Sequence, residues 1–181
     1  MKMKPFVAAL AVVVSLMSLI SCEKEGVKLF DGNYSFKTSG ILTVERTAKV
    51  SESDASTEIL DIPDGNRTFR LALTSESGQM NIIKTGDNSV IVTMNIVGGD
   101  ALVFNGKAEG KVLTLDPAVR FLSFRDGANT VSLEITVSGT AEKHDDVAIF
   151  TLEYTGGGET TLYDYKILAS EVKCVAKLNE D

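Results

Sequence analysis

Tryptophan is absent from this chain of 181 residues, and histidine, cysteine and proline are scarce, at one, two and three residues. Two cysteines and one histidine cannot supply the four side chains of a Cys/His zinc site, nor a framework of several disulfides. The chain carries 18 basic and 25 acidic side chains, which gives a net charge of −7. Because a charge-driven binder of nucleic acid needs a basic surface, we expect no nucleic-acid partner.

The hydrophobic residues make up 44% of the chain, which is enough for a buried core at this length. A disordered tail and a disulfide scaffold are both excluded by this composition. The length is that of one ordinary domain.

Residues 1–21 have the features of an export signal. Lys2 and Lys4 form a short positive segment, and residues 6–17 are apolar apart from Ser15. This apolar run is shorter than the roughly 20 residues that span a bilayer.

The apolar run ends in Leu19-Ile20-Ser21-Cys22, which resembles the signal of bacterial lipoproteins. The resemblance implies that the Cys22 thiol is diacylated, that the chain is cut before it, and that the new amino group is acylated. Because no aspartate directly follows Cys22, resemblance to the inner-membrane retention signal favours the outer membrane of a Gram-negative cell, on its periplasmic or surface face. The membrane is then a partner through the acyl anchor. An ordinary signal peptide with an incidental Cys22 is the alternative.

Removal of residues 1–21 leaves 160 residues, and the loss of two lysines changes the net charge from −7 to −9. Lipidation of Cys22 would leave Cys174 as the one free thiol, so a disulfide within the mature domain is excluded. Cys174 alternates with Val172 and Ala176. We therefore predict that Cys174 is a buried small apolar residue.

From Gly32 onward, apolar and polar residues alternate with a period of two. In residues 130–138, for example, one face holds Val131, Leu133, Ile135 and Val137. This pattern is typical of strands with one buried and one solvated face. The clear strand candidates are 34–44, 67–74, 130–138 and 147–155, and the weaker ones are 79–84, 89–97, 101–108, 111–116, 119–124, 161–168 and 171–177. No stretch of ten residues has helical spacing.

The gaps between these candidates are short and rich in glycine, as at Gly98-Gly99-Asp100 and Gly156-Gly157-Gly158, and Pro117 also lies in a gap. Short gaps predict antiparallel neighbours, and a meander of many strands must close or double to cover its edges. We predict an all-β antiparallel meander that closes as a barrel, with a two-sheet β-sandwich as the alternative. The predicted division is a signal peptide (1–21), a lipidated tether (22–31), one all-β domain (32–178) and a tail (179–181). The long polar segment 45–66 is either an ordered flap or a mobile loop.

The first strand opens with Gly32-Asn33-Tyr34, and with the meander that follows it resembles the lipocalin-like barrels of bacterial lipoproteins. In that family a Gly-x-Trp motif closes the barrel floor under a later arginine. Here Tyr34 stands in the place of the tryptophan, and the final strand offers Lys173 and Lys177 in place of an arginine. The resemblance implies a lipocalin-like barrel that holds a small apolar or amphipathic ligand.

The sequence contains no set of residues that forms a recognisable catalytic or metal site. His144 lies in Lys143-His144-Asp145-Asp146, which we interpret as a polar hairpin turn. Carboxylates such as Glu134 and Glu153 fall on polar strand faces, where solvated charge is the ordinary role. We therefore expect no catalysis, no cofactor and no metal.

The tyrosines are the candidate ligand-binding residues, because a buried phenol needs a polar partner. Tyr34, Tyr154, Tyr163 and Tyr165 end or follow apolar rows and would line a cavity. The predicted function is that of a monomeric, lipid-anchored envelope protein that binds a small apolar or amphipathic molecule. The alternatives are a non-catalytic adhesion or accessory module that binds another envelope protein, and a periplasmic inhibitor of an enzyme that attacks the cell wall.

Overall fold

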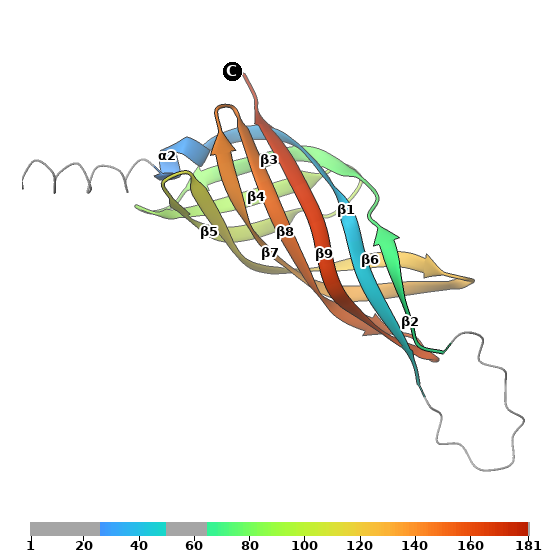
Figure 1. The fold of residues 1–181 in the computed structure, drawn as a ribbon. Coiled ribbons are helices and arrows are strands. Elements are labelled where there is room, and N and C mark those ends of the chain that lie inside the picture. The colour runs from blue at the N-terminus through green and yellow to red at the C-terminus, as the bar shows by residue number, and fades with distance from the viewer. Residues whose placement is uncertain (1–25, 50–64, 181) are drawn as a thin grey trace, which may run out of the picture.

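The computed structural model describes residues 26–49 and 65–180, and within these ranges almost the whole chain is strand (Figure 1). One short helix, α2 (Gly26–Phe30), precedes the strands. The strands are β1 (Gly32–Ala48), β2 (Arg67–Ala72), β3 (Glu76–Lys84), β4 (Ser89–Ile96), β5 (Leu102–Glu109), β6 (Val112–Asp126), β7 (Asn129–His144), β8 (Val147–Glu159) and β9 (Tyr163–Leu178).

The strands form one antiparallel sheet that closes on itself. From β3 to β9 each strand pairs with its neighbours in the sequence, and β9 pairs with β1 along almost its whole length. The ring has eight members, because β2 and β3 lie one after the other along the same edge of β1. The predicted all-β meander that closes into a barrel is confirmed, and the two-sheet sandwich is not formed.

The predicted alternation produces the core of the barrel. The inward row of β7, which includes Leu133, Ile135 and Val137, is fully buried, while its outward neighbours Ser132 and Glu134 are exposed. The other strands contribute similar rows, so apolar side chains fill most of the interior.

Cys174 is fully buried in the inward row of β9, as predicted. Its neighbours Val172 and Ala176 in the same row are buried as well.

The helix α2 closes one end of the barrel, which we call the closed end. Val27 and Phe30 are fully buried there, and a Cβ on Gly26 would stand 2.8 Å from the backbone nitrogen of Gly110. The described fold therefore begins within residues 22–31, which the sequence predicted to be a tether. The sequence did not reveal this helix because five residues are too few to show a helical period. In the predicted tail, the backbone N–H of Asn179 donates to the carbonyl of Asn33.

Two strands each join a pair of strands that the sequence indicated as separate. Strand β6 joins the predicted strands 111–116 and 119–124, and Pro117 lies inside it, where the pairing with β7 shifts register between Leu115 and Ala118. The proline interrupts the pairing without ending the strand. Strand β9 likewise joins two predicted strands.

The glycines have two different roles. Gly98, Gly110 and Gly127 have positive φ angles at turns, as expected. Gly156, however, belongs to β8 and not to a turn; its φ is 122°, and a Cβ there would collide with the carbonyl of Glu134. A glycine is required at this position because β8 packs too closely against β7 to leave room for a side chain.

The segment 45–66 is only partly described, because β1 continues to Ala48 and residues 50–64 lie outside the described ranges. The predicted signal, Cys22 and the choice between flap and loop for this segment fall outside them as well.

The unequal strand lengths leave one part of the ring without backbone pairing. Strand β6 pairs with β5 only from Val112 to Leu115, and from Ala118 onward it pairs with β7 alone. Strand β2 pairs with β1 alone. Among the described strands, Arg67–Ala72 and Ala118–Asp126 therefore face each other without a hydrogen-bonded ladder, and we call this the β2–β6 seam (Figure 1).

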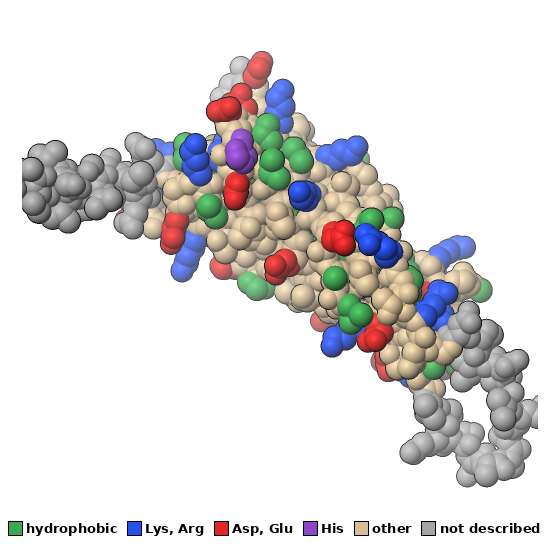
Figure 2. All heavy atoms as spheres, in the orientation of Figure 1, with side chains coloured by type: hydrophobic (Ala, Val, Ile, Leu, Met, Phe, Trp, Pro, Cys, Tyr) green, Lys and Arg blue, Asp and Glu red, His purple; other side chains and the backbone are tan. Residues whose placement is uncertain are grey.

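The face of the barrel seen in Figure 2 carries charged side chains of both signs. Figure 2 shows Lys, Arg, Asp and Glu side chains distributed over the visible face, with small groups of hydrophobic side chains between them. Within residues 26–49 and 65–180, no helix has the length and apolar character needed to cross a membrane.

Candidate functional site: the seam pocket

Side chains hold the β2–β6 seam together where the backbone does not. At the end far from α2, Arg67 Nη2 lies 2.6 Å from Asp126 Oδ1, and the rings of Phe69 and Phe124 are 5.9 Å apart. Towards the middle of the barrel, Arg120 of β6 pairs with Glu76, the first residue of β3. The seam is thus fastened at two places.

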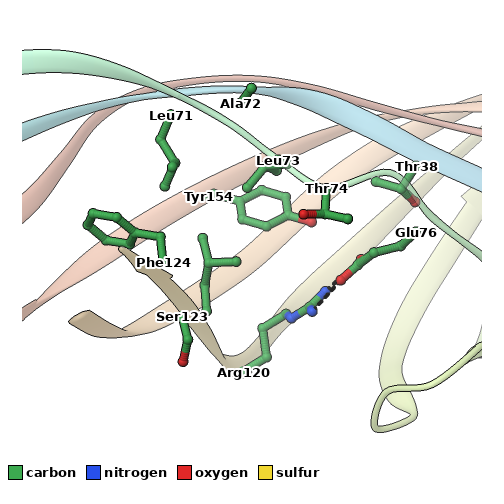
Figure 3. A pocket seen from close by; sticks show the side chains of 11 residues that line it. Thr38, Leu71, Ala72, Leu73, Thr74, Glu76, Arg120, Ser123, Phe124 and Tyr154 are labelled. Carbon is green, nitrogen blue, oxygen red and sulfur yellow. Dashed lines mark hydrogen bonds and ion pairs between the residues drawn. The ribbon is translucent and has the colours of Figure 1, made fainter. Parts of the chain in front are cut away.

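Between these two fastenings lies a cavity of about 190 Å³, which opens to solvent and which we call the seam pocket (Figure 3). Residues of β1, β2, β3, β6 and β8 and of the β2–β3 connection line it. They are Thr38, Leu71, Ala72, Leu73, Thr74, Glu76, Arg120, Leu122, Ser123, Phe124 and Tyr154.

The seam pocket has an apolar side and a polar corner. Leu71, Leu73, Leu122 and Phe124 form the apolar side, and all four are partly buried against the core. In Figure 3 the ring of Tyr154 projects into the pocket, and the side chain of Arg120 extends toward Glu76. An apolar wall with a few converging polar groups is the usual character of a small-molecule site.

The polar corner contains a bidentate ion pair. Arg120 Nη2 donates to Glu76 Oε1 at 2.6 Å, and Nη1 donates to Oε2 at 3.0 Å. The two side chains are 20% and 24% exposed, so solvent screens the pair only in part. The hydrogen bonds to Glu76 raise the pKa of Arg120, and burial raises the pKa of Tyr154 to about 12. Tyr154 is therefore a neutral phenol at physiological pH.

The hydroxyl of Thr38 completes this corner. Thr38 is 3% exposed, and among the described residues its Oγ1 has no oxygen or nitrogen hydrogen-bond partner, only the thiol of Cys174 beside it. The residue opposite Thr38 on β9 is Cys174, whose thiol is only a weak hydrogen-bonding group. Burial raises the pKa of this thiol to about 11.

Tyr34 lies away from the seam pocket, at the closed end. Its hydroxyl donates to the carbonyl of Phe30 at 2.8 Å and accepts from Lys143 Nζ at 2.9 Å. The Lys143 amine also lies 4.5 Å from the centroid of the Tyr34 ring. Strand β7 therefore supplies the cation that the lipocalin resemblance placed on the final strand. Lys173 and Lys177 are exposed on the outer face of β9.

Tyr163 and Tyr165 lie at the end far from α2, in a buried charged cluster around Asp126. Arg46 Nη1 and the Tyr165 hydroxyl both donate to Asp126 Oδ2 at 2.9 Å. The guanidinium of Arg46 lies 4.3 Å from the centroid of the Tyr163 ring. Of the four predicted ligand-binding tyrosines, only Tyr154 lines the seam pocket, and the other three belong to two separate clusters.

The sequence reading missed Glu76 and Arg120. One signal was available for Arg120, since it shares its strand parity with Leu122 and Phe124 and therefore points inward. A charged residue in an apolar row needs a buried partner or a polar cavity. Nothing in the sequence indicates that Glu76 is this partner, because the pairing depends on how the ring closes.

His144 is the last residue of β7, and the adjoining Asp145 has a positive φ of 48°, so the interpretation as a polar hairpin turn is confirmed. Its imidazole is exposed and lies 3.6 Å from Glu142. Within the described ranges, no group of three or more His, Cys, Asp or Glu side chains is placed to hold a metal ion.

No family model and no curated protein sequence matches the chain. Among solved structures, it is similar to a redesigned β barrel with a TM-score of 0.38 and 11% identity, over 86% of this chain and 96% of the other. It is also similar to EF1p2_mFAP2b bound to DFHBI, with a TM-score of 0.39 and 10% identity, over 87% of this chain and 99% of the other.

Proposed function

We propose that this chain is a lipid-anchored binding protein of the bacterial envelope, which holds a small amphipathic molecule in the seam pocket. The observation that carries the proposal is the Thr38 hydroxyl, which is buried at the edge of a cavity with an apolar side and has no oxygen or nitrogen hydrogen-bond partner among the described residues. An unsatisfied buried hydroxyl costs about 1–3 kcal/mol. A ligand with one polar group and an apolar body satisfies this hydroxyl and covers Leu71, Leu122 and Phe124 at the same time.

The seam supports the proposal because it offers a route into the pocket. Strands joined by a hydrogen-bonded ladder separate only when several hydrogen bonds break together. Across the seam, only side chains join β2 to β6. Because the pocket already opens to solvent, a ligand enters it at the seam while the ladder of the ring stays intact.

The anchor in this proposal fits the closed end of the barrel. Only residues 23–25 separate Cys22 from the first residue of α2. At roughly 3.5 Å per residue, this linker reaches at most about 14 Å. An acylated Cys22 would therefore hold the closed end near the membrane surface, with the seam in the side wall of the barrel left open to solvent.

Ligand binding is tested on protein lacking residues 1–22, which retains every described residue, with benzyl alcohol as the probe in a ¹H–¹⁵N NMR titration. We expect the amides of Leu71–Thr74 and Arg120–Phe124 to shift. Leu122→Trp fills the pocket and should abolish these shifts. The matched control Val119→Trp alters an exposed position on the same strand and should preserve them. Shifts that are absent, or that map away from the seam, would contradict ligand binding at this site.

Lipid anchoring is tested separately, by growing cells that express the full chain with an alkynyl palmitate. The wild-type protein should incorporate the label and sediment with the outer membrane. Cys22→Ser should do neither, while the control Cys174→Ser should do both. Incorporation that is unaffected by Cys22→Ser would show that Cys22 is not the lipidated residue.

A further inference from the structure

The polar corner of the seam pocket has no charge left to offer a ligand. Arg120 directs two hydrogen bonds to the two oxygens of Glu76, at 2.6 and 3.0 Å, so each charge already has its counter-charge. An anion that approached Arg120 would also approach the Glu76 carboxylate, and an ammonium group that approached Glu76 would meet the guanidinium. In a partly buried site, such like-charge contacts add to the desolvation penalty of the incoming ion.

The groups that remain in this corner are neutral hydroxyls. Thr38 Oγ1 has no oxygen or nitrogen partner among the described residues and meets only the weakly hydrogen-bonding thiol of Cys174. The phenol of Tyr154 points into the pocket beside the Arg120 guanidinium, which can only donate to its oxygen, so the phenol O–H is left to donate to a ligand. A hydroxyl both donates and accepts a hydrogen bond, so the pair matches an alcohol, a phenol or a carbonyl group. Thr38 lies on β1, where its backbone pairs with both β3 and β9, and Tyr154 lies on β8, where its backbone pairs with Val137 of β7.

The volume sets the size of the ligand. A cavity of about 150 Å³ accommodates a benzene ring, and the seam pocket has about 190 Å³. The space therefore matches one ring, or a short branched chain, with one polar substituent.

We propose that the seam pocket selects a ligand with an uncharged hydrogen-bonding head on a single apolar ring or short chain, and that the Glu76–Arg120 pair excludes carboxylates and amines. This inference rests on the proposed ligand-binding function and specifies the class of ligand. In this arrangement the ion pair keeps charged ligands out, and the hydroxyls of Thr38 and Tyr154 bind the uncharged polar group of the ligand.

The test compares four probes of nearly equal size on the protein lacking residues 1–22: benzyl alcohol, toluene, benzoate and benzylamine, each titrated by NMR. For the wild type we expect benzyl alcohol to bind most tightly, toluene more weakly, and the two ions most weakly. Thr38→Val keeps the shape of the side chain and removes the hydroxyl. This substitution should weaken the binding of benzyl alcohol by roughly 3- to 10-fold, which is the contribution of one hydrogen bond, and should leave the binding of toluene unchanged.

Glu76→Gln provides the sharper test, because it leaves Arg120 without its counter-charge. The affinity for benzoate relative to benzyl alcohol should rise by about 10-fold or more over the wild type. Glu153→Gln is the matched control; it removes the same charge from the exposed face of β8, beside Tyr154, and should leave the order of the probes unchanged.

The outcomes separate this inference from the proposed function. Benzoate or benzylamine binding to the wild-type pocket as tightly as benzyl alcohol would overturn the inference and leave ligand binding in place. Failure of all four probes to bind the wild type would overturn both. If circular dichroism shows that Glu76→Gln does not fold, the order of probe affinities for the wild type and the effect of Thr38→Val still test the inference.

Discussion

Arg46 and Asp126 lie 80 residues apart in the chain, and they form a buried ion pair of 2.9 Å at the end of the barrel far from α2. Asp126 also accepts hydrogen bonds from Arg67 at 2.6 Å and from the Tyr165 hydroxyl at 2.9 Å. These contacts join β1, β2, β6 and β9 at the place where β2 and β6 lack a common ladder. The carboxylate of Asp126 therefore replaces, with side-chain bonds, the backbone pairing that the seam does not have.

Asp126→Asn should strongly destabilise the barrel, because it removes the carboxylate charge that pairs with the buried guanidinium of Arg46. Removal of one partner of a buried ion pair costs about 3–5 kcal/mol. Chemical denaturation followed by circular dichroism measures the free energy of unfolding. The matched control is Glu171→Gln, which breaks the exposed Arg70–Glu171 pair, whose side chains are 61% and 63% exposed. The free energy of unfolding of the control should fall by less than about 1 kcal/mol. An equal fall in the two variants would contradict a special role for Asp126.

The same carboxylate predicts how stability depends on pH. Burial alone would raise the pKa of Asp126, but hydrogen bonds from Arg46 and Tyr165 outweigh burial and lower it below its ordinary value of 3.8. The folded state therefore holds the proton less tightly than the unfolded state. The stability that Asp126 contributes is complete above about pH 4 and is lost as the pH falls through the lowered pKa of the folded state. The difference in unfolding free energy between the wild type and Asp126→Asn should shrink in acid, and a constant difference would show that the carboxylate does not titrate as described.

The fold could be predicted from the sequence because the evidence for it is local. Period-two alternation in residues 130–138 decides which side chains of β7 face inward, and glycines such as Gly127 mark the reversals. The boundaries were harder to predict. Pro117 looked like a break between strands, yet one register shift accommodates it within β6. Helix α2 is stabilised by the packing of Phe30 in the barrel and not by its own periodicity.

The candidate site could be predicted only in part, because it depends on how the ring closes. Parity places Tyr154 and Arg120 inward, but no local pattern shows that β5 separates from β6 after Leu115 and leaves a seam. The partner of Tyr34 illustrates the same limit. Lys143 comes from β7 and not from the final strand, and only the three-dimensional arrangement of the barrel brings the two side chains together.

Tyr34→Phe should destabilise the closed end by about 1–3 kcal/mol, because it leaves two buried polar groups without a partner. The Phe30 carbonyl loses its donor, and the Lys143 amine, whose pKa burial lowers, loses its acceptor. The double variant Tyr34→Phe with Lys143→Met should recover part of this loss, since it also removes the stranded amine.

The control for this pair is Lys177→Met, which alters an exposed lysine of the final strand and should change stability by no more than about 0.5 kcal/mol. All variants are compared by denaturant unfolding at neutral pH. A double variant that is less stable than Tyr34→Phe alone would show that Lys143 stabilises the closed end without the help of the tyrosine hydroxyl.

Cys174 should be inert toward thiol reagents in the folded protein. It is fully buried in the inward row of β9, and burial raises its pKa to about 11, so at mildly alkaline pH very little thiolate is present and none of it is accessible. On the protein lacking residues 1–22, iodoacetamide should label the thiol only in concentrated guanidinium chloride, with the mass increase read by mass spectrometry. Val175→Cys in a Cys174→Ala background is the control, because Val175 is 47% exposed on the same strand and a thiol there should react without denaturant. Rapid labelling of Cys174 in the native protein would mean that β9 separates from β1 or β8 far more readily than the pairing of Cys174 with Thr38 and Phe150 implies.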